Sequence, residues 1–487
     1  MKKSIFTLLL ALTAVLALKA EQYTGDIVVT MDGQDNIATV TVTVTPGADG
    51  LNTFELQLPD FGTMTMTGVP SSTQNGITVY SAERNVNTAM GLMYTTLFAR
   101  TVDGMMAANV TILAYGITMW FNTVGDHFQL PNSDMEAWTN SYGEPDRWHG
   151  FKTASGTYAS TSAGLVSLEQ SDDVREGATG HSALMTAGSV FGIVANGTMT
   201  NGRLNAGSPF ATNTANHAEM DQNKGTDEFF MPIYAKPDMF NVWLKYANSN
   251  ADHKASVSVK TFDGTYYQEP VDQVYTNLSG SIVGGSIPAG DWTFYSFPFD
   301  YDSYAANDAA SKAIFVTFST NGNPGQGNRG DVLYVDDMEL IYLAEMTDLR
   351  CQGVTIEGWD PAVTAYNIVM DSKPALDDFT ATVTGASAVV AKTMEQNADG
   401  TYRIAISAVP GDLQAATCYI ITVTVPAGIK GDVDDNGVVT IADVTLLIDY
   451  LLGSSEEINE YNADVDGDQR ISIADVTSLI DMLLKKN

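Results

Sequence analysis

The sequence predicts a mostly β, multidomain chain that ends in a small all-α module built to bind metal. At 487 residues the chain exceeds the usual size of a single domain. Apolar and polar residues alternate over many short segments before residue 428, which is the period of half-buried strands. Residues 428–487 contain an acidic loop followed by an amphipathic helix, and then the same pattern again. We expect a signal peptide over 1–20 and domains at 21–130, 131–343, 344–427 and 428–487.

The first twenty residues have the pattern of a secretory signal peptide. A basic start, Met1-Lys2-Lys3, precedes an apolar run from Ile5 to Leu18, and polar sequence returns at Lys19. The run is too short for a membrane span. We expect cleavage after Ala20, a bacterial protein that is secreted or associated with the cell surface, and no insertion into a membrane.

Composition narrows the range of partners. With 58 acidic and 24 basic residues the formal net charge is −34, which argues against nucleic acid or an anionic membrane as a partner. The five histidines show no ligand spacing, and no zinc motif, Ser-His-Asp signature or dinucleotide fingerprint appears.

Residues 21–130 predict one antiparallel barrel or sandwich. Ile27-Val-Val-Thr-Met31, Ala38-Thr-Val-Thr-Val-Thr-Val44 and Val110-Thr-Ile-Leu113 are strand-like, with turn signals such as Asp103-Gly104 between them. The segment resembles the calycin-like β-barrel domains of secreted bacterial proteins. Such a barrel either holds a small apolar ligand or is filled by its own side chains.

Residues 131–343 predict a large β sandwich. The segment starts Leu130-Pro-Asn-Ser-Asp-Met-Glu-Ala-Trp138 and ends with Val335-Asp-Asp-Met-Glu-Leu-Ile-Tyr342. A domain with one such acidic segment at each end resembles carbohydrate-binding jelly-roll modules, and more narrowly the carbohydrate-metabolism domain of secreted proteins from gut-type bacteria. In that resemblance the two acidic segments are neighbours and share a structural Ca²⁺, with Asp134, Glu136, Asp336 and Asp337 as candidate ligands. Acids exposed at strand ends are the alternative.

Aromatic side chains are the candidates for sugar contacts, because their faces stack on pyranose rings. Most aromatics in a sandwich belong to the core, and the sequence alone does not choose among the candidates. These are Trp243, Tyr246, Tyr266, Tyr267, Trp292, Tyr295, Tyr301 and Tyr304.

Residues 344–427 predict a compact β spacer. Gly358-Trp-Asp-Pro-Ala-Val-Thr-Ala-Tyr366 matches the turn of cadherin-like or immunoglobulin-like sandwiches, and residues 415–425 are a plausible last strand. In such folds the first and last strands run parallel and adjacent, which would bring Cys351 and Cys418 together. A disulfide is the expectation, with two thiols as the alternative; secretion permits the bond.

The two acidic loops have the ligand spacing of EF-hand type calcium loops, with oxygen ligands at positions 1, 3, 5, 7, 9 and 12. Oxygen ligands without His or Cys favour Ca²⁺. Gly437 holds the turn position of the first loop and Gln469 that of the second, so we expect the second site to be weaker. The first loop supplies Asp432, Asp434, Asn436, Val438, Thr440 and Asp443, and the second supplies Asp464, Asp466, Asp468, Arg470, Ser472 and Asp475.

A helix is predicted after each loop, with apolar residues at i, i+3, i+4 and i+7. Each helix is too short to be stable alone, so the two stripes are expected to pack together and to fold only with metal. The stripes are Val444, Leu447, Ile448 and Leu451, and Val476, Leu479, Ile480 and Leu483.

These residues resemble a type I dockerin, a duplicated loop–helix Ca²⁺ module whose loops end in Asp. The resemblance implies a cohesin domain of a scaffold protein as partner. Where studied dockerins carry a hydroxyl pair that cohesin reads, this chain has Ile441-Ala442 and Ile473-Ala474. These four residues are either an apolar partner-binding contact or part of the packing of the module.

Three functions remain open. The leading hypothesis is a secreted glycan-binding protein that a Ca²⁺-dependent dockerin fixes to a cohesin-bearing complex for polysaccharide capture or breakdown. The rival is a glycoside hydrolase of a cellulosome-like complex, which needs two carboxylates on either side of the sugar. Candidate pairs are Glu144 with Asp146 and Asp227 with Glu228, in stretches expected to be solvated. An adhesin for host protein is not separated from these by sequence.

Overall fold

The computed structural model confirms a mostly β chain with helices gathered in the C-terminal module. It describes residues 19–31, 34–48, 50–58, 62–74, 77–88, 91–102, 104–123, 128–190, 192–224, 227–250, 252–370, 372–414, 416–425, 428–454, 457–468 and 470–485. Most of the predicted signal peptide, and His127 and Gln469, therefore lie outside the described residues. No helix among the described residues is long and apolar enough to cross a membrane.

The chain divides into two compact units. One contains residues 1–364, 379–393 and 405–419, and the other contains residues 365–378, 394–404 and 420–487. The five-part division expected from the sequence stays a prediction.

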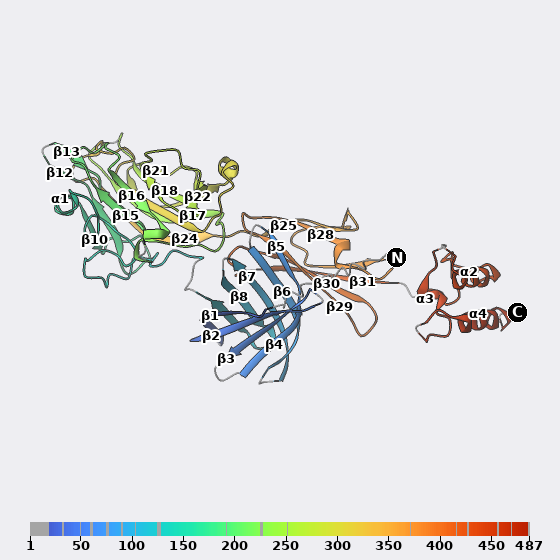
Figure 1. The fold of residues 1–487 in the computed structure, drawn as a ribbon. Coiled ribbons are helices and arrows are strands. Elements are labelled where there is room, and N and C mark those ends of the chain that lie inside the picture. Colours follow the sequence, from blue (N-terminus) through green and yellow to red (C-terminus); the bar gives the residue numbers. More distant parts are fainter. Residues whose placement is uncertain are drawn as a thin grey trace, which may run out of the picture. The chain divides into compact units, whose positions relative to one another are not determined.

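The first strands of the chain form one antiparallel sheet, drawn in blue in Figure 1. Its order is β4-β3-β2-β1-β9-β8-β7-β6-β5, and β4 also contacts β6, so the sheet curls into a barrel. The burial pattern alternates along most strands, as a barrel with a packed interior requires. The strands are β1 (Glu21–Met31), β2 (Gln34–Pro46), β3 (Asn52–Leu58), β4 (Gly62–Val69), β5 (Ser71–Gln74), β6 (Ile77–Thr88), β7 (Gly91–Val102), β8 (Met105–Ile112) and β9 (Ile117–Asn122).

The second group of strands forms the sandwich, in the order β10-β11-β24-β17-β22-β20-β18-β23-β14, with β21 paired to β18. Strand β22 pairs with β17 over most of its length and with β20 at its last two residues, so it passes from one layer to the other. The strands of this path are β10 (Ser167–Ser171), β11 (Ser182–Thr186), β14 (Thr198–Thr200), β17 (Met239–Ala247), β18 (Ala255–Phe262), β20 (Leu278–Ile282), β21 (Ser286–Ile287), β22 (Gly290–Asp300), β23 (Ala313–Ser319) and β24 (Val332–Ile341).

Two small sheets and short helical segments lie in the connections of the sandwich. The sheets are β12 (Gly188–Val190) with β13 (Ile193–Ala195), and β15 (Arg203–Ala206), β16 (Asn216–Met220) and β19 (Tyr267–Glu269). The one α-helix described in this part is α1 (Ala159–Ala163). The buried core of the sandwich includes Trp148, Phe240, Tyr246, Phe315 and Phe318.

The start and end of the sandwich segment are adjacent, as the sequence predicted. The Met338 backbone N–H donates to the Ser133 carbonyl at 3.0 Å, and the Gln129 side chain bonds the N–H and carbonyl of Leu340 at 2.8 and 2.7 Å. The two acidic segments are thus brought side by side.

The strands that follow correct the expectation about the cysteines. Strand β31 (Thr417–Thr424) runs parallel to β27 (Ala365–Val369) and not to β25 (Glu345–Cys351), which pairs antiparallel with β26 (Val354–Thr355) and β28 (Phe379–Thr384). Two further strands are β29 (Val389–Gln396) and β30 (Tyr402–Val409). No disulfide joins Cys351 to Cys418, and both are half-exposed thiols. The expected bond is absent because the strand pairing from which it was inferred is different.

The C-terminal module, red in Figure 1, contains α2 (Ile441–Leu451), α3 (Glu460–Ala463) and α4 (Ile473–Lys485). Helices α2 and α4 are the predicted pair, whereas the short α3 was not predicted. Val444 and Leu447 of α2 meet Val476 and Leu479 of α4 in a buried core. The rest of each predicted stripe packs less completely: Ile448, Leu451 and Ile480 are 36%, 37% and 39% exposed.

Candidate metal centre and docking surface

Asp443 is the centre of the first acidic loop. Its carboxylate is fully buried and accepts the backbone N–H groups of Val433 (2.7 Å) and Asp434 (3.2 Å) through Oδ1, and that of Thr440 (2.8 Å) through Oδ2. Thr440 is the N-cap of α2 and forms a capping box with Asp443. One carboxylate therefore ties the start of the loop to the start of the helix.

The second loop repeats this geometry. Asp475 is fully buried and accepts the N–H of Val465 at 2.8 Å, that of Asp466 at 3.2 Å and that of Ser472 at 2.8 Å. The duplication seen in the sequence is thus a duplication of hydrogen bonds at matched positions.

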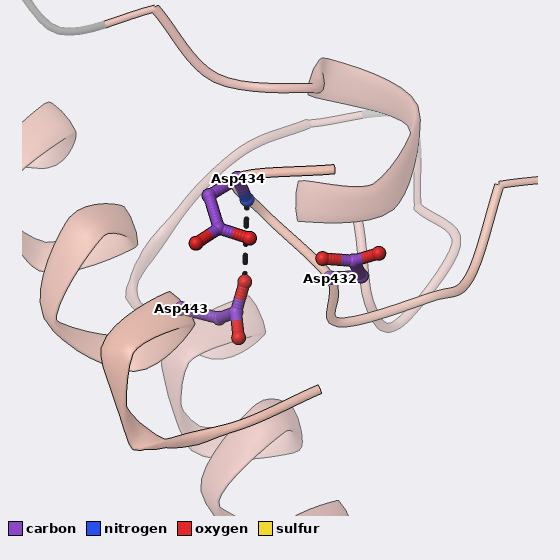
Figure 2. A group of neighbouring side chains, drawn as sticks. All are labelled: Asp432, Asp434 and Asp443. Carbon is purple, nitrogen blue, oxygen red and sulfur yellow. Dashed lines mark hydrogen bonds between the residues drawn. The ribbon is translucent and has the colours of Figure 1, made fainter. Parts of the chain in front are cut away.

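Both loops bring carboxylates close together. In the first loop, oxygens of Asp432, Asp434 and Asp443 lie within 4.8 Å of one another. Figure 2 shows these three side chains gathered in the loop. In the second, the oxygens of Asp464, Asp466 and Asp468 do so. The structure places these six predicted ligands in two clusters; Asp475 does not belong to the second.

The electrostatics of the loops fit a cation. Desolvation raises the pKa of Asp434, and the charge of Asp443 adds to this. Desolvation also acts on Asp443, but its hydrogen bonds to backbone N–H groups outweigh it and lower the pKa, so Asp443 stays ionised. The Oδ1 atom of Asp464 is buried and has no hydrogen-bond partner among the described residues. Clustered oxygens of this kind are the ligands that Ca²⁺ prefers.

The turn position of the first loop is as expected: Gly437 has φ of +86°, in the left-handed region that favours glycine. In the second loop, Gly467 has φ of +78° and lies two residues before the turn position, where the first loop has Asp435 with φ of +55°. The predicted strain at Gln469 concerns a residue that is not described, so the relative strength of the two sites stays a prediction.

The four residues predicted to contact a partner are exposed. Ile441 and Ile473 are 70% and 71% exposed, and Ala442 and Ala474 are exposed as well. The alternative, that they pack inside the module, is wrong.

Each helix carries a longer exposed stripe than the sequence analysis recognised. On α2 and the residue after it, Ile441, Ile448 and Leu452 share a face, with Leu452 81% exposed. On α4, Ile473, Ile480 and Leu484 share the equivalent face, with Leu484 69% exposed. We call these the two apolar stripes. Their signal was visible in the sequence, since the same residue types recur thirty-two positions apart on the outward side.

The acidic residues of the sandwich are only partly brought together. Asp337 forms an ion pair with Arg175 (2.7 Å), and Glu136 accepts the N–H of His181 (2.7 Å). Asp336 is buried, which raises its pKa to about 7, and the charges of Asp337 and Glu136 add to this. With Asp134 exposed, the four do not form a tight oxygen cluster like those of the loops. A structural metal here stays a prediction.

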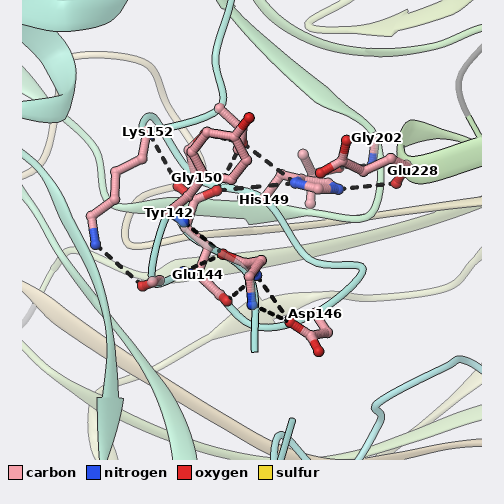
Figure 3. A network of polar contacts seen from close by, with 12 residues as sticks. Tyr142, Glu144, Asp146, His149, Gly150, Lys152, Gly202 and Glu228 are labelled. Carbon is pink, nitrogen blue, oxygen red and sulfur yellow. Dashed lines mark hydrogen bonds and ion pairs between the residues drawn. The ribbon is translucent and has the colours of Figure 1, made fainter. Parts of the chain in front are cut away.

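Glu144 and Asp146, one of the two acidic pairs considered for hydrolysis, are held in structural contacts. The Glu144 carboxylate is 1% exposed and accepts hydrogen bonds from Thr153 Oγ1 (2.7 Å) and the Lys152 N–H (3.0 Å). Figure 3 shows Glu144 within this network of polar contacts. Asp146 accepts the N–H groups of Thr139 (2.9 Å) and Asn140 (3.1 Å). The expectation that Glu144 is solvated is wrong, because this loop folds around its carboxylate.

His149 is buried beside Glu144 rather than at the surface. Burial lowers the pKa of His149, so the ring is neutral and its Nε2–H donates to the Glu228 carbonyl at 3.0 Å. The Glu228 side chain is exposed, and that of Asp227 lies outside the described residues.

The predicted aromatic candidates separate into two groups. Tyr246 and Tyr267 are 1% exposed and belong to the core. Trp243 and Trp292 are half-buried on the outer side of the sandwich. Tyr266, Tyr295, Tyr301 and Tyr304 are also half-buried.

The barrel interior leaves little room for a ligand. A cavity of about 20 Å³ lies among apolar side chains that include Phe54, Met64, Met66, Leu97 and Phe121. An apolar cavity that holds benzene is about 150 Å³. The barrel is thus filled mainly by its own side chains.

Comparisons with known proteins identify the C-terminal module. Residues 430–484 match the family model described as the dockerin type I domain, which confirms the resemblance seen in the sequence. No curated protein matches the chain.

Several solved structures are similar to parts of the chain at low scores, among them the following three. A candidate glycoside hydrolase from Bacteroides thetaiotaomicron has a TM-score of 0.34 and 14% identity, covering 53% of this chain and 87% of that one. The CBM22-1 xylan-binding domain of Paenibacillus barcinonensis Xyn10C has a TM-score of 0.19 and 12% identity, covering 40% and 91%. The tandem of its two CBM22 domains has a TM-score of 0.22 and 11% identity, covering 66% and 92%.

Proposed function

We propose that the protein is a secreted glycan-binding protein that its C-terminal dockerin attaches, in a Ca²⁺-dependent manner, to a cohesin domain of a scaffold or surface complex. The observation that carries the proposal is the dockerin itself: two matched acidic loops, each followed by a helix with an exposed apolar stripe. The dockerin match covers only the C-terminal segment. The glycan-binding half is supported by the sandwich and its outward aromatic side chains.

Calcium would be held by the carboxylates of Asp432, Asp434 and Asp443 in the first loop, and of Asp464, Asp466 and Asp468 in the second. When bound, Ca²⁺ supplies the positive charge that lets these carboxylates stay together. The chain itself positions them through the hydrogen bonds that the Asp443 and Asp475 carboxylates accept from backbone N–H groups, which also fix the starts of α2 and α4. An ordered loop thereby fixes the start of each helix and, with it, the position of the apolar stripe.

The apolar stripes are proposed as two equivalent cohesin-binding faces. Isoleucine and leucine side chains exposed in matched positions on two helices form the apolar patches that protein partners cover. Their equivalence implies that losing one stripe leaves a second that can still bind.

The test uses the full chain and a panel of immobilised type I cohesins. Ile441→Asp alone and Ile473→Asp alone should each retain binding, and the double variant should lose it, because a buried unpaired charge strongly disfavours an apolar contact. Asp449→Asn, an exposed change on α2, is the matched control. Undiminished binding by the double variant would show that the stripes are not the docking faces.

The glycan-binding half is tested with a glycan array and a reducing-end release assay on the same protein. Binding without release of sugar is the expected result. Release that is lost when carboxylates of the sandwich are substituted would favour the alternative, a glycoside hydrolase. The Glu144 and Asp146 pair does not favour that alternative, because both carboxylates are engaged in the loop shown in Figure 3.

A structural metal in the sandwich is tested by counting bound Ca²⁺ per chain. Two ions are expected from the dockerin loops. A third that disappears in Asp336→Asn would place a metal between the two acidic segments, and a count of two that is unchanged in this variant would remove that prediction.

A further inference from the structure

The outer face of one layer of the sandwich carries a group of aromatic side chains. Along β17, the residues Phe240, Val242, Leu244 and Tyr246 point into the core, so Trp243 and Lys245 lie on the opposite face. In register, Trp243 is opposite Phe294 of β22, and Lys245 is opposite Tyr334 of β24. Three neighbouring strands thus contribute to one outward surface.

Four rings make up this surface, which we call the aromatic platform: Trp243, Trp292, Phe294 and Tyr334. The centroids of Trp243 and Phe294 are 5.5 Å apart, and those of Trp292 and Tyr334 are 6.0 Å apart. Phe294 is 48% exposed, and the other three rings are half-buried. An apolar surface held open to solvent on a sheet face is a feature of binding sites.

Two cations and their carboxylate partners frame the platform. The Arg175 guanidinium lies 5.1 Å from the Trp243 ring and is bonded to Asp337 through Nε (2.8 Å) and Nη2 (2.7 Å). Lys245 Nζ lies 5.4 Å from the Tyr334 ring, 2.8 Å from Asp173 and 3.5 Å from Asp291. Asp173 in turn accepts the indole N–H of Trp292 at 3.0 Å.

These contacts preorganise the rings. The bond from Lys245 lowers the pKa of Asp173, and the bond from Asp173 raises that of Lys245, so both are charged at neutral pH. Ion pairs that also hold ring side chains reduce the entropy lost when a ligand binds. A fixed apolar surface with donors and acceptors at its rim is thereby built before any ligand arrives.

A pyranose ring has the complementary chemistry, with an apolar C–H face and hydroxyl groups around its edge. The charged residues around the platform decide between a neutral and an anionic glycan. Two cations (Arg175, Lys245) face three carboxylates (Asp173, Asp291, Asp337), a formal net charge of −1, on a chain of net charge −34. An anionic glycan meets no unpaired cation there.

We propose that the aromatic platform of Trp243, Trp292, Phe294 and Tyr334 binds pyranose rings of a neutral glycan. The proposal rests on the glycan-binding half of the proposed function and adds its location and the charge class of its ligand. The cations position rings and hydroxyl groups rather than pairing with an acidic sugar.

The test measures binding of the Ca²⁺-loaded full chain to immobilised neutral polysaccharides and to uronate-containing ones. The variants are Phe294→Ala and Trp243→Ala, with Phe210→Ala as the matched control, since Phe210 is 67% exposed in the same domain and outside the platform. Each platform variant should bind neutral glycan about tenfold more weakly, which is the loss of one ring contact. Phe210→Ala should bind as the wild type does.

Phe294→Ala keeps the test valid if Trp243→Ala unfolds, because an exposed ring contributes little to the core. Tryptophan fluorescence is a second readout: neutral glycan should change the emission of the wild type, and the change should be reduced in Trp243→Phe.

The outcomes separate the two proposals. Wild-type binding that both platform variants retain overturns the platform and leaves the glycan-binding function intact. Wild-type binding confined to uronate-containing glycans overturns the neutral class. Absence of all glycan binding by the wild type overturns the glycan-binding function and the platform together.

Discussion

Asp443 shows how one residue serves both the fold and the candidate metal centre. Its carboxylate caps α2 and holds the first turn of the loop, and it lies in the oxygen cluster with Asp432 and Asp434. The sequence identified this residue by ligand spacing alone. The capping contribution could also be anticipated, since Thr440 and Asp443 have the spacing of a capping box.

Asp443→Ala should destabilise the dockerin by about 2 kcal/mol even before any effect on Ca²⁺, because buried N–H groups lose their acceptor. Hydrogen–deuterium exchange of peptides covering residues 430–452 in the full chain measures this, with faster exchange expected. Asp449→Ala, exposed on the same helix, should exchange as the wild type does. Equal protection in both variants would contradict the capping role.

His217 and Glu219 make the stability of the sandwich depend on pH. The hydrogen bond from His217 is the largest cause that lowers the pKa of Glu219 to about 2, and Lys224 adds to it. Burial lowers the pKa of His217, but its bonds to Glu219 and to the Thr214 carbonyl outweigh burial and raise it.

The contribution of Glu219 to the free energy of unfolding is present above its unfolded pKa of about 4.3 and is lost as pH falls toward 2. The contribution of His217 is present below about pH 6.5 and is lost as pH rises through its raised pKa. Thermal unfolding of wild type and Glu219→Gln should therefore differ most between about pH 4.5 and 6.5, by about 1 kcal/mol given the partial exposure of the pair. A difference that is constant from pH 3 to 9 would refute the coupling.

At the scale of elements, the two helices of the dockerin depend on a small shared core. Leu447 and Leu479 are fully buried, whereas Leu452 is 81% exposed. Leu447→Ala should cost about 2–5 kcal/mol, which is enough to unfold a module of this size. Leu452→Ala should leave stability unchanged and, because the stripe on α4 remains, should retain cohesin binding.

Circular dichroism at 222 nm in the presence of Ca²⁺ tests this prediction. We expect the helical signal to fall in Leu447→Ala and to stay unchanged in Leu452→Ala. The opposite pattern would mean that the buried and exposed faces of α2 have been exchanged.

The same helices show how far the spacing of apolar residues predicts which side chains are buried. The repeat predicted α2 and α4 and their buried residues Val444, Leu447, Val476 and Leu479. It also counted Ile448, Leu451 and Ile480 as core, because an apolar residue at helical spacing looks the same whether it meets a second helix or a partner protein. Helix α3 has no apolar periodicity in four residues and was missed for that reason.

Strand pairing was the second feature that could not be predicted from the sequence. Alternation located the β domains, yet the partner of β31 is β27 and not β25, and the expected Cys351–Cys418 bond fails with it. The aromatic platform depends on the same information, because only the register of β17 with β22 and β24 shows that Trp243 lies beside Phe294. Long-range pairing is set by tertiary packing, which a single sequence does not display.

At the scale of the whole molecule, Ca²⁺ should control one part of the chain and leave the remainder unaffected. The oxygen clusters lie in residues 432–468, while the barrel and sandwich have large apolar cores of their own. Chelation should remove exchange protection from residues 430–485 and leave that of β1–β9 unchanged, because binding energy is folding energy in such modules. Protection of 430–485 that survives chelation would show that the dockerin folds without metal.

The central claim is that this chain is attached through a Ca²⁺-loaded dockerin. Its most direct test is the binding of the full chain to immobilised type I cohesins in Ca²⁺, after chelation, and after Ca²⁺ is restored. We expect binding in Ca²⁺, loss on chelation and full recovery, with Asp443→Ala plus Asp475→Ala inactive throughout. Binding that persists in chelator, or no binding to any cohesin by Ca²⁺-loaded wild type with protected helices, would contradict the account.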